Sequence, residues 1–173
     1  MASKKAKRTA IVDEDSSTVK DFKAGDERRQ YFLMKSEPTS FSIENLESCK
    51  NQTEPWNGVR NYAARNIMQT MKLGDKETSN PEQIVKEAYP DDTAFDSKSH
   101  YFDAKSTVEN PRWFMVDVKL VAKLDEPVLL KNLKLKDELN EMQLFRQGRL
   151  SVQGVAPEEW AYICSELIGK DYY

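Results

Sequence analysis

The stretch YFLMKSEP, residues 31–38, begins with four apolar or aromatic residues and ends in a polar turn that contains proline. A run of this kind predicts a buried β-strand. Pro38 has no backbone N–H to give to a sheet, so the strand is expected to end before it. Ordered structure is therefore expected to begin here. We predict a single domain over residues 30–169, followed by a short C-terminal tail at residues 170–173.

Downstream of this strand, helical and extended patterns alternate along the chain. Ser42 is suited to cap a short helix that starts at Ile43, and a second helix is expected from Asn61 to Gly74. Pro157 is well placed to open a last helix. Alternating or apolar runs predict strands over three further ranges, 84–90, 113–124 and 149–153. This interleaving predicts an α+β domain, built as a small β-barrel with flanking helices.

Charge and composition restrict the partners of this domain. The chain has 26 basic and 29 acidic residues and a net charge of −3, so as a whole it does not attract a polyanion. A nucleic acid would have to be bound by a local patch or pocket. Cys49 and Cys164 lack the spacing of a disulfide framework or a zinc site, and no apolar run has the length of a membrane span. We expect no metal, no cofactor and no membrane partner.

Residues 1–29 are polar, mixed in charge and poor in aromatic residues, which predicts a disordered tail. The tail contains a short basic cluster, made of Lys4, Lys5, Lys7 and Arg8. Such a cluster is typical of segments that nuclear import receptors bind, so a nuclear location is expected, with the cytoplasm as a second compartment. An ordinary solvated tail is the alternative interpretation.

Six segments occur in an order and spacing that resemble a known family. They are YFLMKSEP (31–38), FSIENL (41–46), WNGVRNYAARN (56–66), VKEAYPDDTAFD (85–96), NPRWFMVDV (110–118) and RLSVQ (149–153). Together they resemble the EVE domain. The resemblance implies a PUA-like fold with a pocket between the MKSEP and WNGVRN segments. It also implies capture of a modified base in DNA or RNA, with 5-hydroxymethylcytosine in DNA as one such base.

The residue types in these segments suit the capture of a base. A base that leaves its stack needs an aromatic surface and fixed polar groups, and Trp56 offers the surface. Lys35 and Arg60 are candidates for contacts with phosphate or with the base edge. The complete predicted lining of the pocket is Lys35, Ser36, Glu37, Trp56, Asn57, Arg60, Asn61, Ser151 and Gln153.

Several of these residues also have a structural interpretation. Trp56 follows Pro55 and could be an anchor of the core. Arg60 could form an ion pair with Glu37. Asn57 could simply make a turn with the following glycine, and it stands where the family more usually has an acidic residue.

The sequence departs from the family pattern after Gly74. Related sequences continue there with two strands and a histidine of the pocket, whereas this chain has the polar segment 75–83. The domain is therefore expected to lack two strands and to leave strand edges open, so that Leu33 and Val116 lose packing partners. The histidine is expected to have no counterpart, because His100 lies in a different loop.

The residues that catalysis usually requires are scarce in this sequence. It has no glycine loop that would cradle a phosphate, no nucleophile elbow and no HExxH motif. Lys35 and Glu37 could in principle exchange protons, but such a close pair is more often structural. A non-catalytic binding module is therefore expected. The alternatives are a protein-interaction module and a truncated form that binds no nucleic acid.

Overall fold

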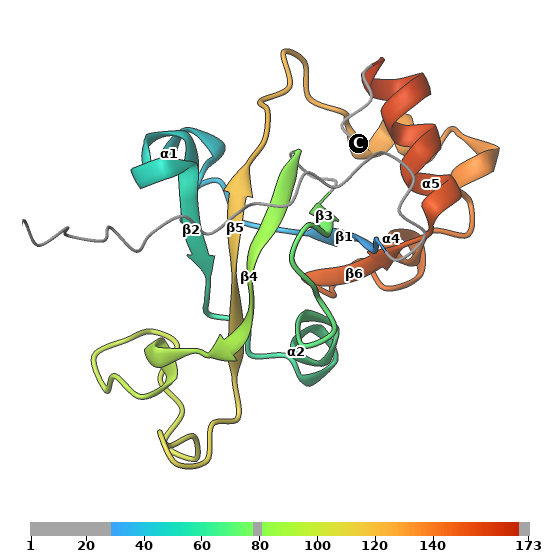
Figure 1. Cartoon of the computed structure of the whole chain (residues 1–173). Helices are drawn as coiled ribbons and strands as arrows, with labels where there is room; N and C mark the ends of the chain where they lie inside the picture. Colours follow the sequence, from blue (N-terminus) through green and yellow to red (C-terminus); the bar gives the residue numbers. More distant parts are fainter. Residues whose placement is uncertain (1–28, 78–80, 170–173) are drawn as a thin grey trace, which may run out of the picture.

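The computed structural model describes residues 29–77 and 81–169 (Figure 1). The predicted disordered tail up to residue 28, its basic cluster and the C-terminal tail at residues 170–173 lie outside the described residues, as do residues 78–80. The strands are β1 (Tyr31–Met34), β2 (Thr53–Trp56), β3 (Lys76–Glu77), β4 (Glu82–Pro90), β5 (Phe114–Leu120) and β6 (Val152–Val155).

The described strands form one sheet in the order β2-β5-β4-β3-β1-β6. Only β1 and β3 are parallel, and the other neighbouring strands are antiparallel. The sheet is open, with β2 at one edge and β6 at the other. The α+β class is confirmed.

Short helices surround this sheet (Figure 1). The helices are α1 (Ile43–Ser48), α2 (Tyr62–Met68), α3 (Leu130–Leu133), α4 (Gln143–Arg146) and α5 (Pro157–Tyr162), with the 3₁₀ turns η1 (Lys50–Gln52), η2 (Asp92–Ala94) and η3 (Asp137–Leu139). A π-helical segment, η4 (Ile163–Ile168), continues α5 and ends at Gly169, whose φ of 69° suits glycine. Ser42 caps α1 through a reciprocal pair of hydrogen bonds with Asn45, as its sequence position predicts.

Two apolar clusters hold the domain together. The first packs α2 against β1, β4, β5 and β6, and includes Met34, Met68, Ile84 and Val116. The second packs α5 and η4 against β1 and β6, and Trp160 stacks there on Tyr31 with 4.8 Å between the ring centroids. Because β1 contributes to both clusters, the first apolar run of the sequence becomes the centre of the fold.

The polar segment after Gly74 does not leave β1 and β5 without partners, and this corrects the sequence-based expectation. Residues 76–77 form β3, which pairs with β1 on one side and with β4 on the other. Leu33 is only 9% exposed and Val116 is fully buried. The reason is that any backbone can supply the N–H and C=O groups of a ladder, whatever its side chains are.

The boundaries of several elements also differ from the prediction, and β4 begins at Glu82 rather than at residue 84. Helix α2 ends at Met68, and Gly74, with a φ of 91°, belongs instead to the turn that leads into β3. Strand β5 stops at Leu120 rather than continuing to residue 124, and β6 starts at Val152. Side-chain patterning alone places element ends less accurately than hydrogen bonding does.

Candidate functional site

A cavity of about 670 Å³, called the main cavity below, lies over the first apolar cluster. Its walls come from three separate parts of the chain, 35–46, 54–60 and 100–101, with Ser151 completing them. The buried residues Glu82 and Val118 also line it. The MKSEP and WNGVRN segments, between which the family resemblance implies a pocket, both line this cavity.

Trp56 lines the main cavity at the end of β2. Its side chain is half-buried and packs against the first apolar cluster, so it is both a wall of the cavity and a support of the core. The next residue, Asn57, also lines the cavity, and its side chain is exposed. Trp56 therefore anchors the core, as its structural interpretation predicts, and it also lines the cavity, whereas stacking of a base on it stays a prediction.

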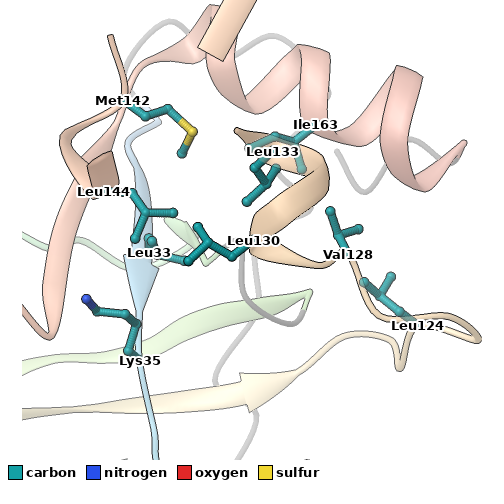
Figure 2. A pocket seen from close by; sticks show the side chains of 9 residues that line it. All are labelled: Leu33, Lys35, Leu124, Val128, Leu130, Leu133, Met142, Leu144 and Ile163. Carbon is teal, nitrogen blue, oxygen red and sulfur yellow. The ribbon is translucent and has the colours of Figure 1, made fainter. Parts of the chain in front are cut away.

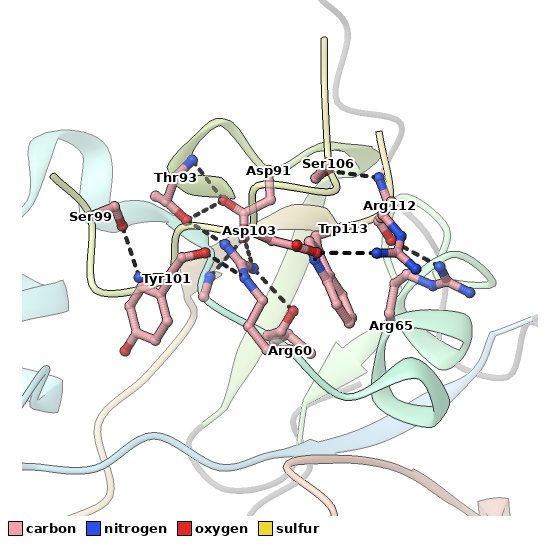
Figure 3. A network of polar contacts seen from close by, with 12 residues as sticks. Arg60, Arg65, Asp91, Thr93, Ser99, Tyr101, Asp103, Ser106, Arg112 and Trp113 are labelled. Carbon is pink, nitrogen blue, oxygen red and sulfur yellow. Dashed lines mark hydrogen bonds and ion pairs between the residues drawn. The ribbon is translucent and has the colours of Figure 1, made fainter. Parts of the chain in front are cut away.

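Arg60 lines the main cavity, but most of its donors are already used (Figure 3). Nη1 donates to Asp91 Oδ2 at 2.7 Å, Nη2 donates to Thr93 Oγ1 at 3.1 Å, and Nε donates to the carbonyl oxygen of Tyr101 at 2.7 Å. The ion pair predicted from the sequence exists, but its carboxylate is Asp91 and not Glu37. Arg60 therefore joins the loop after β2 to the segment after β4.

Asp91 is fully buried at the centre of this network. Besides Arg60, its carboxylate accepts hydrogen bonds from the Gly58 N–H at 2.9 Å and from the hydroxyl and N–H of Thr93. Burial by itself would raise the pKa of Asp91, but the hydrogen bonds and the Arg60 charge outweigh it and lower this pKa below the ordinary value. Asp91 is therefore a charged structural centre that fixes the loop containing Asn57 and Arg60.

A second set of contacts supports the same loops (Figure 3). The Trp113 indole N–H donates to Asp103 Oδ2 at 2.7 Å, and Arg112 lies 3.7 Å from the same oxygen. Tyr62 stacks on the Trp113 ring with 4.7 Å between centroids. Trp113 is a core residue, only 6% exposed, and these contacts stabilise residues 91–113 beside the cavity.

The loop after β1 supplies three of the predicted residues to the cavity. Lys35 Nζ donates to the carbonyl oxygen of Gly148 at 2.6 Å, and burial lowers the pKa of this amine. The Ser36 hydroxyl donates to the carbonyl oxygen of Phe41 at 3.2 Å. Glu37 is exposed, and its backbone carbonyl oxygen accepts hydrogen bonds from the N–H groups of Ser40 and Phe41.

Two predicted residues do not line the main cavity. Asn61 caps α2, with its side-chain oxygen accepting from the N–H groups of Ala63 and Ala64. Gln153 pairs with Leu33 across the sheet, and its amide donates to the carbonyl oxygens of Gln147 and Leu150. Both side chains therefore serve the fold. Ser151, by contrast, lies at the cavity as predicted.

The predicted lining omitted several residues of the main cavity, among them Glu82, His100 and Tyr101. His100 was expected to lie away from the pocket, but the loop after η2 brings it and Tyr101 to the cavity. Glu82 was part of a segment expected to be a polar loop, and it is only 3% exposed. No local pattern marks these residues, because their position depends on pairing between distant segments.

Glu82 faces Glu77 across the β3–β4 pair, and both side chains are buried. Glu77 Oε1 accepts a hydrogen bond from the Met34 N–H at 2.7 Å. Glu82 Oε2, in contrast, is buried without a hydrogen-bond partner. Burial, together with the Glu77 charge, raises the pKa of Glu82 to about 9, which favours the neutral form of this side chain in the folded chain.

Lys35 also borders a second and smaller hollow, of about 240 Å³ (Figure 2). Its other lining residues are apolar, namely Leu33, Leu124, Val128, Leu130, Leu133, Met142, Leu144 and Ile163. With Lys35 as the one polar side chain of its lining, this hollow offers few groups that could orient a polar ligand. The main cavity, with its mixed lining, is therefore the better candidate for a binding site.

Residues 29–77 and 81–169 show neither a metal-binding cluster nor a membrane-spanning helix. No cluster of three or more histidine, cysteine or acidic side chains in these ranges could hold a metal ion. Within the same ranges, no helix has the length and apolar character needed to cross a membrane.

The match to a family model decides the relationship of this chain to known proteins. The model of the EVE domain matches residues 30–77 and 82–166. This chain belongs to the EVE-domain family. Among its relatives, thymocyte nuclear protein 1 of Mus musculus is 38% identical, with 92% of this chain and 88% of the relative covered. An uncharacterised protein of Schizosaccharomyces pombe is also 38% identical, over 79% of this chain and 68% of that protein.

Solved structures of EVE-domain relatives have the same fold. A hypothetical protein from Leishmania major is 49% identical, with a TM-score of 0.73 over 79% of this chain and 93% of that one. Human THYN1 protein, solved in complex with 5-methylcytosine-containing DNA, is 37% identical, with a TM-score of 0.75 over 82% of this chain and 99% of that one.

The comparisons also bear on the departure after Gly74. The alignment with the mouse relative runs over 198 residues, which exceeds the 173 residues of this chain. The relative therefore contains residues that have no counterpart here. The family match is divided between residues 77 and 82, which is the segment where the sequence leaves the family pattern. The short strand β3 ends at residue 77, where the first part of the family match also ends.

Proposed function

We propose that this EVE domain is a non-catalytic module that captures a modified cytosine of DNA in the main cavity. The observation that carries the proposal is the position of Trp56, a half-buried indole in the wall of a cavity that also has polar side chains. The cavity volume of about 670 Å³ lies within the range of small-ligand pockets, roughly 300 to 1,000 Å³. The complex of human THYN1 protein with 5-methylcytosine-containing DNA supports DNA as the partner.

The modification itself is a finer part of this proposal. Ser36, Asn57 and Ser151 give the cavity hydroxyl and amide groups beside its apolar surface. Such a lining can accept the methyl group of 5-methylcytosine and can also satisfy the extra hydroxyl of 5-hydroxymethylcytosine. We therefore propose both bases as ligands, and binding to matched duplexes that differ in one base ranks them.

Trp56→Ala should weaken binding to a duplex with one 5-methylcytosine by about 5- to 150-fold, because base–aromatic stacking contributes about 1 to 3 kcal/mol. Fluorescence anisotropy with matched methylated and unmethylated duplexes measures this change. Trp56→Phe keeps a ring and should retain most of the affinity. Leu73→Ala, at an exposed residue outside the cavity lining, is the control. Equal binding of the two duplexes by the native chain would contradict the proposal.

The affinity should depend only weakly on salt. Lys35 and Arg60 are the cations of the cavity lining, and Arg60 is largely engaged with Asp91 and its neighbours. One or two phosphate contacts predict a slope of log affinity against log salt of about −1 to −2. Anisotropy titrations from 50 to roughly 300 mM salt measure it. A slope steeper than about −4 would indicate that the domain binds along the phosphate backbone instead.

We further propose a nuclear location. Relatives at 38% and 40% identity are named thymocyte nuclear protein 1. Binding of an import receptor by Lys4, Lys5, Lys7 and Arg8 stays a prediction from the sequence, because these residues lie outside the described ranges. Imaging of a fluorescent fusion of the full chain, with and without alanine at the four positions, tests it.

A further inference from the structure

Tyr101 is an aromatic residue of the main cavity that was not among the pocket residues predicted from the sequence. It lies in the loop after η2, far along the chain from Trp56, and both residues line the same cavity. Its side chain is 39% exposed, so a large part of the ring is open to a ligand. The neighbouring Phe102 is similarly exposed, at 44%, but does not line the cavity.

The backbone of Tyr101 is fixed on both sides (Figure 3). Its carbonyl oxygen accepts the 2.7 Å hydrogen bond from Arg60 Nε, and its N–H donates to Ser99 Oγ at 3.1 Å. The Arg60 guanidinium also lies 5.6 Å from the centroid of the tyrosine ring. Because Asp91 orients Arg60, the same network holds the loop of Trp56 and the loop of Tyr101.

The ring of Tyr101 rests directly on the backbone of Gly58. A Cβ atom added to Gly58 would lie 2.8 Å from Cε2 and from Cζ of the ring, which is closer than real Cβ contacts allow. Gly58 has a φ of 77°, and its N–H donates to Asp91 at 2.9 Å. Glycine at this position therefore permits both the turn after Trp56 and the close approach of the ring.

We propose that Tyr101 is a second aromatic contact for the captured base, held in place by Gly58 and Arg60 before the ligand arrives. The inference rests on the proposed function and adds a residue to it. A ring that is already ordered loses little conformational entropy on binding, so its contact area contributes to affinity. Its π-face can stack on any base, whatever the modification.

The first test compares three variants of the full chain by anisotropy with the 5-methylcytosine duplex. Tyr101→Ala should lower the affinity by about 5-fold or more, as expected for loss of one base–aromatic contact. Tyr101→Phe keeps the ring and should bind within about 2-fold of the native chain. Phe102→Ala is the matched control, because it removes a neighbouring exposed ring outside the cavity, and it should bind like the native chain.

A second test separates direct contact from a structural role. Gly58→Ala should displace the tyrosine ring and weaken binding, but its effect should shrink when Tyr101 is already alanine, because the ring is then absent. Thermal melts of all variants identify any that lose folded structure. If Tyr101→Ala loses folded structure, Tyr101→Leu takes its place. Leucine fills space without an aromatic face, so this variant should also bind more weakly than the native chain.

The outcomes distinguish this inference from the proposed function. A native chain that binds no duplex overturns both. If Trp56→Ala weakens binding but folded Tyr101→Ala or Tyr101→Leu binds like the native chain, only the role of Tyr101 is overturned. Fully additive effects of Gly58→Ala and Tyr101→Ala would likewise contradict the placement of the ring by Gly58.

Discussion

Glu82→Met should raise the free energy of unfolding at pH 7 by about 3 kcal/mol. In the native chain, Glu82 is buried beside Glu77 with one oxygen unpaired, and its pKa is about 9. Folding at pH 7 therefore requires this acid to take up a proton that the unfolded chain does not hold. One pKa unit corresponds to about 1.4 kcal/mol, and about 2.5 units separate pH 7 from an ordinary glutamate. An apolar side chain of similar length removes that cost.

The same group gives stability a pH dependence of known sign. The pKa of Glu82 is raised in the folded state, so the folded chain binds more protons than the unfolded chain between about pH 4.5 and 9. The free energy of unfolding should accordingly fall as pH rises through that window, by up to about 1.4 kcal/mol per unit. Asp91, whose pKa is lowered, loses its stabilising charge only at acidic pH below this window.

Urea unfolding at pH 5, 6, 7 and 8 measures both effects, in the native chain and in Glu82→Met. The variant should be the more stable protein at pH 7 and should show a flatter profile. Glu87→Met is the control, because Glu87 lies on the same strand, is exposed and pairs with Lys72 at the surface. That change should alter stability by less than about 1 kcal/mol. A native stability profile that does not change with pH would show that the pKa of Glu82 is not raised in the folded chain.

Asp91→Ala should lower the free energy of unfolding by about 3 to 5 kcal/mol. The substitution removes the acceptor of Arg60, Gly58 and Thr93, and leaves a partly buried guanidinium without its carboxylate. Losing one member of a buried, hydrogen-bonded charge pair costs far more than losing a surface pair. Urea unfolding of the native chain and the variant at pH 7 gives the difference.

Asp92→Ala provides the comparison, because the adjacent carboxylate is exposed, and this change should stay within about 0.5 kcal/mol. DNA binding gives a second readout. Because Asp91 holds Gly58 and Arg60, folded Asp91→Ala should also bind the 5-methylcytosine duplex more weakly than the native chain. Unchanged stability in Asp91→Ala would mean that the network contributes little to the fold.

Local sequence was sufficient for the elements whose signals lie within a few residues. The apolar run at 31–34, the Ser42 cap and the Pro157 start were each predicted correctly, because side-chain capping and burial of a short apolar run depend on near neighbours. The family resemblance placed the pocket between two of its segments, and the main cavity is lined by both. Element ends were less certain, since ladder hydrogen bonds decide them.

The cavity itself depends more on contacts between distant segments. Arg60 was recognised as a candidate from its own segment. Its carboxylate partner, Asp91, lies 31 positions away in the sequence and was not predicted. Asn61 and Gln153 have the residue types of a binding site, yet their side chains bond to the helix start and to a neighbouring turn. Residue type alone does not show which face of an element a side chain occupies.

The sequence by itself determined the family, the α+β class and the aromatic and polar groups of the WNGVRN segment. Only the tertiary structure decided that Tyr101 meets Gly58, that Asp91 holds Arg60, and that Glu77 and Glu82 are buried. The physical reason is that the backbone of β3 completes the ladder between β1 and β4, whatever side chains it has. Hydrogen bonding of the sheet thus overrides the polarity of residues 76–77 and 82–83, which a local pattern assigns to solvent.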